Sequence, residues 1–599
     1  MRPINLLPID FPEVHEETPE YFYTNVVKPL IPTFIRIMGE GITLDKVKVE
    51  ELGGVIDSVL EEVKTTLAKN SIIIEFQKQE FPKKFKEYKT EVESSMRGLS
   101  FYLKKYDPKN ATHRTYLVNE YLITMNYLED IREVWSVKDL KAYASYREDP
   151  SLNKIVDKNP PADIRDFAMT RLAQDKMNIW NKVRTDKVKA VKFEELVPPF
   201  NPGSSTQKTA LFEYLKIEPI NFSKDTGNAS WDRDAIEQLF VITTDEQLLE
   251  VLQAFVDYSF SAIIKQNFLE GFESNAIDGI TYSNLKLFGT KTFRPTANNI
   301  NFLQLPSTGS IYAKPLKQCL VAPPGYLTWA IDLSALEDRI IANLSGDENK
   351  LAVFTEGLDG HSLSATYYFP DRVKALIGEF TDNKEASIKL KTLVDSGNKV
   401  AKSVRQDGKP VTFGLSYGAF PKKVANTIKC SLKEAEAIFN AYHNEMYPQI
   451  TQMRDKALQV AKQKGYLHLG LGCRIYSDDI DKDSRTLFNS LSQFWSVITL
   501  LALDALYEKI DNEDMGELVK PNATIYDAIY GIVKADAESI KWLNDTIVPL
   551  MTTQIFKGEI ISNEASLDIG PNWSDVVELP NNATIQQIQE VINEIQKIS

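Results

Sequence analysis

The chain has 599 residues, of which 43% are hydrophobic, and it carries a formal net charge of −14. No run of about 18 apolar residues marks a membrane span, so we expect no membrane partner. The negative charge argues against nonspecific binding of polyanions by the whole surface, but it leaves room for a local basic groove. Cys319, Cys430 and Cys473 are too far apart for a zinc motif and favour a reducing, cytoplasmic location.

The first half of the chain is predicted to be mostly helical. Residues 1–40 are proline-punctuated and indicate a solvated arm. Residues 44–69 place apolar side chains at helical spacing, and 232–276 do so again after a loop at 198–206. Residues 83–114 contain nine Lys or Arg against four Asp or Glu. This basic run predicts either a nucleic-acid contact or an ordinary solvated helix face.

The second half alternates strands with long helices, which favours an α+β fold. Apolar strands are predicted at 326–333 and 524–533. Long helices are expected near 386–406, 411–428, 432–463 and 484–510. A tail at 583–598 places Ile585, Ile588, Ile592 and Ile595 on one helical face. That face is expected either to pack on the chain's own sheet or to dock another protein.

Each predicted strand carries one carboxylate. Asp527 interrupts the apolar stretch "ATIYDAIYGIV", and Asp332 ends the strand in "WAIDLSALEDRI". If the two strands are neighbours, the carboxylates meet at one sheet edge, where a hard divalent cation relieves their repulsion. Two Mg²⁺ ions at such a site suit displacement at phosphorus. The alternative is two unrelated acids at strand ends.

A stripe of cations and rings lies between the two strands. In "RQDGKPVTFGLSYG", Arg405, Lys409, Phe413 and Tyr417 follow one another every four residues, on one drifting face of a helix. Cations hold phosphates and rings stack bases, so the stripe fits a nucleoside triphosphate. A solvent-facing amphipathic helix is the alternative. Because proline disrupts helices, we expect the helix to break or to begin near Pro410.

The order of these motifs resembles that of the family A DNA polymerases, the DNA polymerase I superfamily. "DLSALEDR", "RQDGKPVTFGLSYG" and "IYDA" are similar to motifs A, B and C of that family. "TFRPTANNINFLQLP" resembles its primer–template segment, "GHSLSA" the start of its fingers, and "GPNW" the ending of its phage replicases. Residues 41–52 and 200–215 resemble thumb landmarks. The resemblance covers roughly 41–65 and 196–576.

The resemblance implies a right-hand polymerase fold, with an antiparallel palm sheet and helical fingers and thumb. The implied domains are an N-terminal arm 1–40, thumb 41–285 with a helical insertion 66–195, first palm part 286–345, fingers 346–465, second palm part 466–579 and amphipathic tail 580–599. A second insertion is expected at about 371–398. Forty residues before the thumb leave no room for a 3′–5′ exonuclease domain, so we expect proofreading, if any, from another polypeptide.

The resemblance also implies residue roles. Two Mg²⁺ ions would be held by Asp332, Asp527 and the carbonyl of Leu333, and Lys409 would join the carboxylates in catalysis. The incoming dNTP would contact Arg405, Lys409, Phe413, Tyr417, His361 and Glu337, with Glu337 blocking a ribose 2′-hydroxyl. Primer–template DNA would contact Arg294, Asn301, Gln304, Arg485, Asn489, Gln493 and Tyr526. Where the family usually has His-Asp-Glu, this chain has Tyr526-Asp527-Ala528.

We therefore expect a DNA-templated DNA polymerase of phage genome replication, located in the cytoplasm of an infected bacterium. Its expected partners are primer–template DNA, dNTPs and an exonuclease or processivity subunit. The alternatives are a single-subunit RNA polymerase, which Glu337 argues against, and a catalytically silent subunit that binds primer–template DNA. Retention of Asp332, Asp527, Arg405 and Lys409 argues against the silent subunit.

Overall fold

The computed structural model describes residues 18–105, 197–223, 226–306, 310–555 and 559–598. The chain divides into two compact units, one of Met1–Ser58 with Phe260–Ser599 and one of Val59–Ser259. Most of the insertion predicted at 66–195, and most of the basic run at 83–114, lie outside the residues whose side chains are described.

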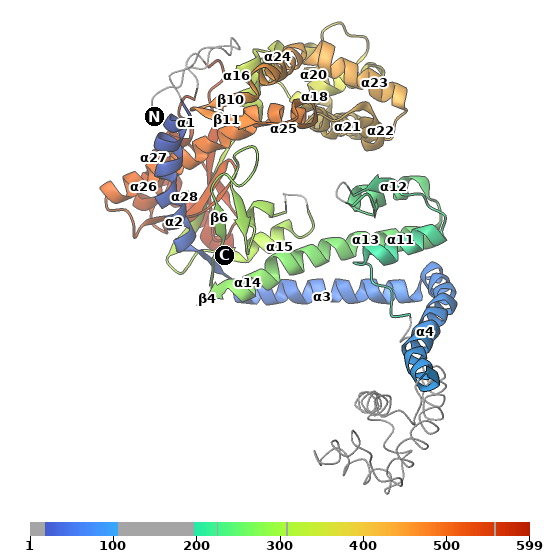
Figure 1. The fold of residues 1–599 in the computed structure, drawn as a ribbon. Helices are drawn as coiled ribbons and strands as arrows, with labels where there is room; N and C mark the ends of the chain where they lie inside the picture. The colour runs from blue at the N-terminus through green and yellow to red at the C-terminus, as the bar shows by residue number, and fades with distance from the viewer. Residues whose placement is uncertain (1–17, 106–196, 224–225, 307–309, 556–558, 599) are drawn as a thin grey trace, which may run out of the picture. The chain divides into compact units, whose positions relative to one another are not determined.

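The centre of the first unit is a five-stranded antiparallel sheet with the order β12-β13-β9-β14-β15 (Figure 1). Its strands are β9 (Tyr326–Leu333), β12 (Val519–Ile525), β13 (Ala528–Lys534), β14 (Ala565–Gly570) and β15 (Val577–Leu579). Strand β9 occupies the predicted range. Trp329, Ile331 and Leu333 alternate on its buried face, as expected for a strand with one face on the core.

The single strand predicted at 524–533 is wrong, because this stretch is a hairpin. β12 ends at Ile525, β13 begins at Ala528, and Ile525 pairs with Ala528. Tyr526 and Asp527 form the two-residue turn, with Tyr526 at a φ of 55°. Tight hairpin turns need such positive φ values, which glycine and asparagine usually supply. An aromatic residue in that position hid the turn in the sequence.

The helices of the first unit cover the sheet and extend from it. One group comprises α1 (Pro19–Phe22), a π-helical turn (Tyr23–Val27), α2 (Lys28–Glu40), α16 (Leu336–Ser345), α17 (Glu348–Thr355), α25 (Ile480–Gln493), α26 (Val497–Asn512), α27 (Ala537–Met551) and α28 (Ile585–Ile598). Of these, α2, α26, α27 and α28 contact strands of the five-stranded sheet. A second helical group lies between β9 and β12 in the sequence. It comprises α18 (Gly360–Tyr368), α19 (Pro370–Ile377), α20 (Asn383–Asp395), α21 (Lys399–Ser416), α22 (Pro421–Ile428), α23 (Leu432–Asn440), a π-helical turn (Ala441–Met446) and α24 (Pro448–Lys464). The helix expected at 411–428 is therefore two helices.

Smaller elements complete the first unit. They are β1 (Ile42–Leu44), β4 (Ala276–Ile277), β5 (Ile280–Thr281) and β8 (Leu320–Val321) in a second sheet, the hairpins β6 (Asn284–Lys286) with β7 (Thr296–Asn298) and β10 (Tyr466–Gly470) with β11 (Cys473–Tyr476), π-helical Lys265–Leu269, α14 (Glu270–Asn275), α15 (Ala313–Gln318), and 3-10 turns at Phe302–Gln304 and Phe494–Ser496.

The solvated arm expected at 1–40 is wrong over its described helical part, 19–40. Phe22, Leu30 and Ile37 are buried in the main core, because α2 packs on α26 and β12. Their spacing follows one helix face, and the prolines at 19, 29 and 32 do not interrupt it. Proline content was therefore a misleading signal here.

The break expected at Pro410 is also wrong, because α21 runs through it without interruption. The ring of Pro410 lies on the exposed side, where it clashes with no neighbouring helix. On the opposite side, Gly408 is buried against α18, and a Cβ at Gly408 would lie 3.6 Å from the backbone of His361 and Ala365. Close packing on α18 compensates for the hydrogen bond that proline removes.

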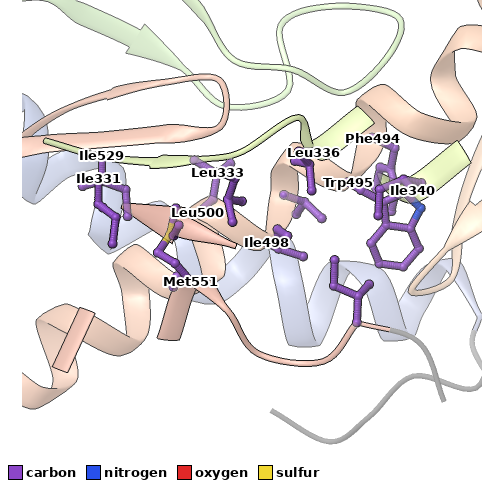
Figure 2. Packing of buried hydrophobic residues seen from close by; sticks show 14 of the residues in the cluster. Ile331, Leu333, Leu336, Ile340, Phe494, Trp495, Ile498, Leu500, Ile529 and Met551 are labelled. Carbon is purple, nitrogen blue, oxygen red and sulfur yellow. The ribbon is translucent and has the colours of Figure 1, made fainter. Parts of the chain in front are cut away.

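The main core lies beneath the five-stranded sheet. Figure 2 draws 14 of its side chains, and those that it labels come from strands and from helices distant in sequence: Ile331, Leu333, Leu336, Ile340, Phe494, Trp495, Ile498, Leu500, Ile529 and Met551. The stretch Ile480–Asn512 is long and apolar enough to cross a membrane, the one such stretch in the described part of the chain. However, 78% of its apolar window is buried inside the protein, as in a core helix.

The C-terminal helix α28 belongs to the same core. Ile588, Ile592 and Ile595 are buried, while Ile585 is 44% exposed. Helix α28 contacts α27 and β15. The prediction that the isoleucine face packs on the chain's own sheet is confirmed, and the alternative of a free docking face is not.

The second unit is mainly helical. It contains the C-terminal part of α3 (Lys46–Lys69), from Val59 onward, all of α4 (Ser71–Lys105), α11 (Ser205–Tyr214) and α12 (Arg233–Ile242), most of α13 (Glu246–Ile264), and a two-stranded ribbon of β2 (Asn221–Phe222) and β3 (Ala229–Ser230). Its core is aromatic, with Phe212 against Trp231 at 4.0 Å and against Phe255 at 6.1 Å between ring centroids. The helical region predicted at 232–276 is confirmed.

Candidate active site

The two carboxylates singled out in the sequence are neighbours. Asp332 is the penultimate residue of β9 and pairs in register with Ala528, the residue that follows Asp527. The backbone N–H of Leu333 donates to the carbonyl oxygen of Asp527 at 3.2 Å. The hairpin turn and the end of β9 therefore present both acids at one edge of the sheet, as the sequence predicted.

The surrounding protein compensates the charges of these two acids only in part. The pKa of Asp332 is raised to about 7, although part of this residue is exposed. The main cause is the loss of hydration in the surrounding protein, and the second is repulsion from Asp527. Loss of hydration also raises the pKa of Asp527, and Arg294 offsets this in part. A site that disfavours its own negative charges is suited to an added cation.

The donors at this edge fit Mg²⁺. Two carboxylates and the backbone of Leu333 offer hard oxygen ligands, which Mg²⁺ prefers, and Mg²⁺ sites usually combine one or two carboxylates with water and substrate phosphates. Among the described residues, no group of three or more His, Cys, Asp or Glu converges as a metal site. A metal here would therefore depend on these two carboxylates together with backbone, water and phosphate oxygens.

A third acid on the same face was missed by the sequence analysis. Asp568 of β14 pairs with Ala330 of β9, two residues before Asp332 and on the same side of the sheet. Loss of hydration raises its pKa, and its charge adds to the repulsion on Asp332. Alternation along "ASLDIG" could have placed Asp568 on the open face, but only once the pairing of β14 with β9 was known.

Two residues with left-handed backbone flank the acids. Ala335 has a φ of 52° at the start of α16, and Tyr526 has a φ of 55° in the hairpin turn. Such conformations cost energy for residues other than glycine and persist where the surrounding structure enforces them. Arg339 supplies part of this enforcement, since its guanidinium donates to the carbonyl oxygens of Ser334 and Ser562 at 2.8 Å.

The cations predicted to hold a triphosphate lie on α21 and α18. Arg405 donates through Nε and Nη2 to both carboxylate oxygens of Asp359, at 2.8 and 2.7 Å. Asp359 is also the N-cap of α18, and its bonds to Arg405 and Ser362 outweigh burial and lower its pKa to about 2. Burial lowers the pKa of His361, and Arg405 and Lys409 act in the same direction. Lys409 is exposed.

Asp359 was not predicted as a site residue. An acid two positions before His361 is a helix-start signal in the sequence. Its ion pair with Arg405, 46 residues away, became visible only in the structure.

The aromatic part of the stripe is Phe413 and Tyr417, and Tyr417 contacts Glu337, which follows β9 in the chain. Phe413 is 66% exposed, and its ring centroid lies 4.8 Å from that of Tyr417. The hydroxyl of Tyr417 donates to Glu337 at 2.9 Å, and the other oxygen of Glu337 pairs with Arg294. The structure thus joins Tyr417, Glu337 and Arg294 in one hydrogen-bonded group.

The remaining predicted DNA contacts lie on α25 and in the segment 301–304. Arg485, Asn489 and Gln493 follow one another every four residues on α25, with Arg485 exposed and the other two partly buried. Asn301 is partly buried and its Oδ1 has no hydrogen-bond partner among the described residues, whereas Gln304 is exposed. Within the described part of the chain, no hydrogen bond or ion pair joins these five side chains to Asp332 or Asp527.

The fold is that of a polymerase domain. It is similar to the POL domain of Pol1 from M. smegmatis, solved in complex with DNA primer-template and dNTP, with a TM-score of 0.53 and 20% identity over 67% of this chain and 66% of that one. The sequence model for DNA polymerase family A matches residues 170–379 and 372–494, which together span more than half of the chain. The chain belongs to DNA polymerase family A.

Curated relatives agree with this assignment. The chain is 28% identical over 371 residues to the DNA polymerase of Escherichia phage T5, covering 56% of this chain and 40% of that protein. It is 25% identical over 292 residues to the thermostable DNA polymerase I of Thermus filiformis, covering 48% and 31%. Because the chain spans less than half the length of these relatives, their whole activity does not transfer directly.

Proposed function

We propose that the chain is a DNA-templated DNA polymerase that extends a primer 3′-hydroxyl with dNTPs. The observation that carries the proposal is the pairing of Asp332 and Asp527 at one sheet edge, where the protein raises the pKa of both acids. Family membership and the hydrogen-bonded pair of Glu337 and Tyr417 support it.

In the proposed mechanism, Asp332 and Asp527 would hold two Mg²⁺ ions, which would supply charge neutralisation at the reacting phosphate and a lowered pKa at the primer hydroxyl. Arg405 and Lys409 bind the triphosphate, and the ion pair with Asp359 holds one edge of the Arg405 guanidinium. Phe413 and Tyr417 pack against the nucleoside.

Further parts of the proposal rest on resemblance. Primer–template DNA would lie on Arg294, Asn301, Gln304 and the α25 face, within a palm, fingers and thumb arranged as predicted. A role in phage genome replication, in the cytoplasm of an infected bacterium, is supported by the similarity to the phage T5 polymerase. The absence of 3′–5′ exonuclease activity from this 599-residue chain, and an accessory subunit that supplies it, stay predictions of the sequence.

Primer extension tests the proposal. We expect the wild-type chain to extend a labelled primer with dNTPs but not with rNTPs in Mg²⁺. Asp332→Asn and Asp527→Asn should each lose extension while still binding primer–template DNA. Asp545→Asn is the matched control, because Asp545 lies on the exposed side of α27 and pairs only with Lys541 in the described structure.

The outcomes separate the candidate functions. Extension with rNTPs instead of dNTPs would support the RNA polymerase, and binding without any extension would support the silent subunit. Near-normal turnover of either Asp→Asn variant at saturating Mg²⁺ would contradict the assignment of the metal ligands.

A further inference from the structure

Arg294 is held on two sides by residues of the candidate active site. Its guanidinium carbon lies 5.0 Å from the ring centroid of Tyr526, within the range of a cation–π contact. Its Nη2 pairs with Glu337. Its Nε is buried and has no hydrogen-bond partner among the described residues. A buried N–H without an acceptor is costly, which indicates that a ligand supplies the acceptor.

The backbone that carries Arg294 is fixed independently of Tyr526. The N–H of Arg294 donates to Thr290 Oγ1 at 2.9 Å, which closes the loop between β6 and β7. The adjacent Phe293 packs edge-on against Phe22 and Phe494, at 6.0 and 6.1 Å between ring centroids. The orientation of the long side chain therefore depends on Tyr526 and Glu337, and not on the loop.

Tyr526 has a defined place in the hairpin. It occupies the first position of the hairpin turn at positive φ, and the next residue is Asp527. One two-residue turn therefore carries both a predicted metal ligand and the ring beneath Arg294. A movement of this turn would shift both groups together.

We propose that Tyr526 is a positioning residue that acts through Arg294. The family resemblance implies that Arg294 reads the primer-side minor groove. In our proposal the ring of Tyr526 holds the guanidinium so that its Nε–H meets an acceptor of the primer's terminal base pair there, N3 of a purine or O2 of a pyrimidine. The inference rests on the proposed function and deepens it. It differs from the sequence-based expectation that Tyr526 contacts DNA directly.

The identity of the residue matters to this role. The face of an aromatic ring attracts a guanidinium, and the phenol ring of tyrosine presents a larger face than an imidazole. Tyrosine stands here in the place where the family usually has histidine.

The test uses two primers that differ in one atom. One ends in guanine and the other in 3-deazaguanine, which lacks the N3 acceptor. The measured quantity is the ratio of single-turnover extension rates on the two primers, the N3 dependence. We expect a clear N3 dependence in the wild type and none in Arg294→Ala. Tyr526→Leu should lower it about three- to tenfold, the range that a cation–π contact supports.

Conservative variants separate positioning from direct contact. Tyr526→Phe keeps the ring and should retain the wild-type N3 dependence, whereas a direct hydroxyl contact with DNA would be lost. In the Arg294→Ala background, Tyr526→Leu should cause no further loss of extension rate on the guanine primer. Melting temperatures of all variants check that the fold is retained.

Three outcomes would overturn the inference. If the losses of extension rate on the guanine primer were additive in the double variant, Tyr526 would act independently of Arg294. Equal losses in Tyr526→Phe and Tyr526→Leu would assign the role to the hydroxyl. A wild-type chain that extends neither primer would overturn the proposed function together with the inference, whereas the first two outcomes require extension and overturn the inference alone.

Discussion

At the scale of single residues, the candidate active site contains an acid pair that the folded protein stabilises poorly without a cation. For Asp332, a pKa raised to about 7 means that the folded state holds its proton more tightly than the unfolded chain does. Stability from this group is therefore lost as the pH rises from about 4 towards about 7. The resulting decrease in the free energy of unfolding is fully present at pH 8, where Asp332 is ionised in both the folded and the unfolded protein.

Asp332→Asn should for this reason stabilise the metal-free protein while abolishing extension. We expect its melting temperature in EDTA to exceed that of the wild type at pH 8, and the difference to shrink at pH 5. Mg²⁺ should raise the melting temperature of the wild type at pH 8 and have little effect on the variant. A variant less stable than the wild type at pH 8 in EDTA would contradict the charge argument.

Glu337 belongs to the same scale, because its two oxygens pair with Tyr417 and Arg294. Glu337→Ala removes the side chain next to the expected sugar site and should relax the exclusion of ribonucleotides. Glu337→Gln keeps the volume and should retain exclusion. The measurement is rNTP against dNTP incorporation opposite one template base. Equal discrimination in both variants and the wild type would show that another group excludes the 2′-hydroxyl.

At the scale of secondary-structure elements, the packing of α21 on α18 determines where the predicted triphosphate contacts lie. A Cβ at Gly408 would meet the backbone of α18 at ordinary van der Waals distance. Gly408→Ala should therefore be neutral or stabilising by up to about 1 kcal/mol, the helix-propensity gain of alanine over glycine. Gly408→Leu should destabilise by about 1–3 kcal/mol, because the larger side chain forces the helices apart.

Denaturant unfolding of the two Gly408 variants measures these effects. Affinity for dNTP should follow the same order, since Arg405 lies on α21 and its partner Asp359 caps α18. Equal stability of the leucine and alanine variants would show that the helices are not in close contact at this point.

The same scale shows what the sequence could and could not predict. Strand β9 was predicted within its range because a continuous apolar run followed by a helix start is a strong local signal. The hairpin at Tyr526 was missed because its turn lacks glycine and asparagine, and the continuity of α21 was missed because tertiary packing at Gly408 offsets the effect of Pro410. The pairing of Asp332 with Asp527 was predictable, but the bonds of Arg405 to Asp359 and of Glu337 to Arg294 depend on long-range geometry.

At the scale of the whole molecule, the last helix is an integral part of the main core. Ile592 is buried in that core, and Ile592→Ala should lower the free energy of unfolding by about 2–5 kcal/mol, as expected for a truncated core isoleucine. Ile585→Ala is the matched control on the same helix, and its exposed side chain should change stability by less than about 0.5 kcal/mol. Similar losses in both variants would contradict the assignment of the buried face.

The joining of α2 and α28 in one core has a consequence for biosynthesis. Phe22 and Ile595 belong to the same buried cluster, although more than 550 positions separate them in the chain. At typical translation rates, the early helix waits about half a minute to two minutes for its last partners to leave the ribosome. During that interval its apolar face has no complete core to enter, so the nascent polypeptide depends on chaperones or on transient contacts until synthesis of α28 is finished.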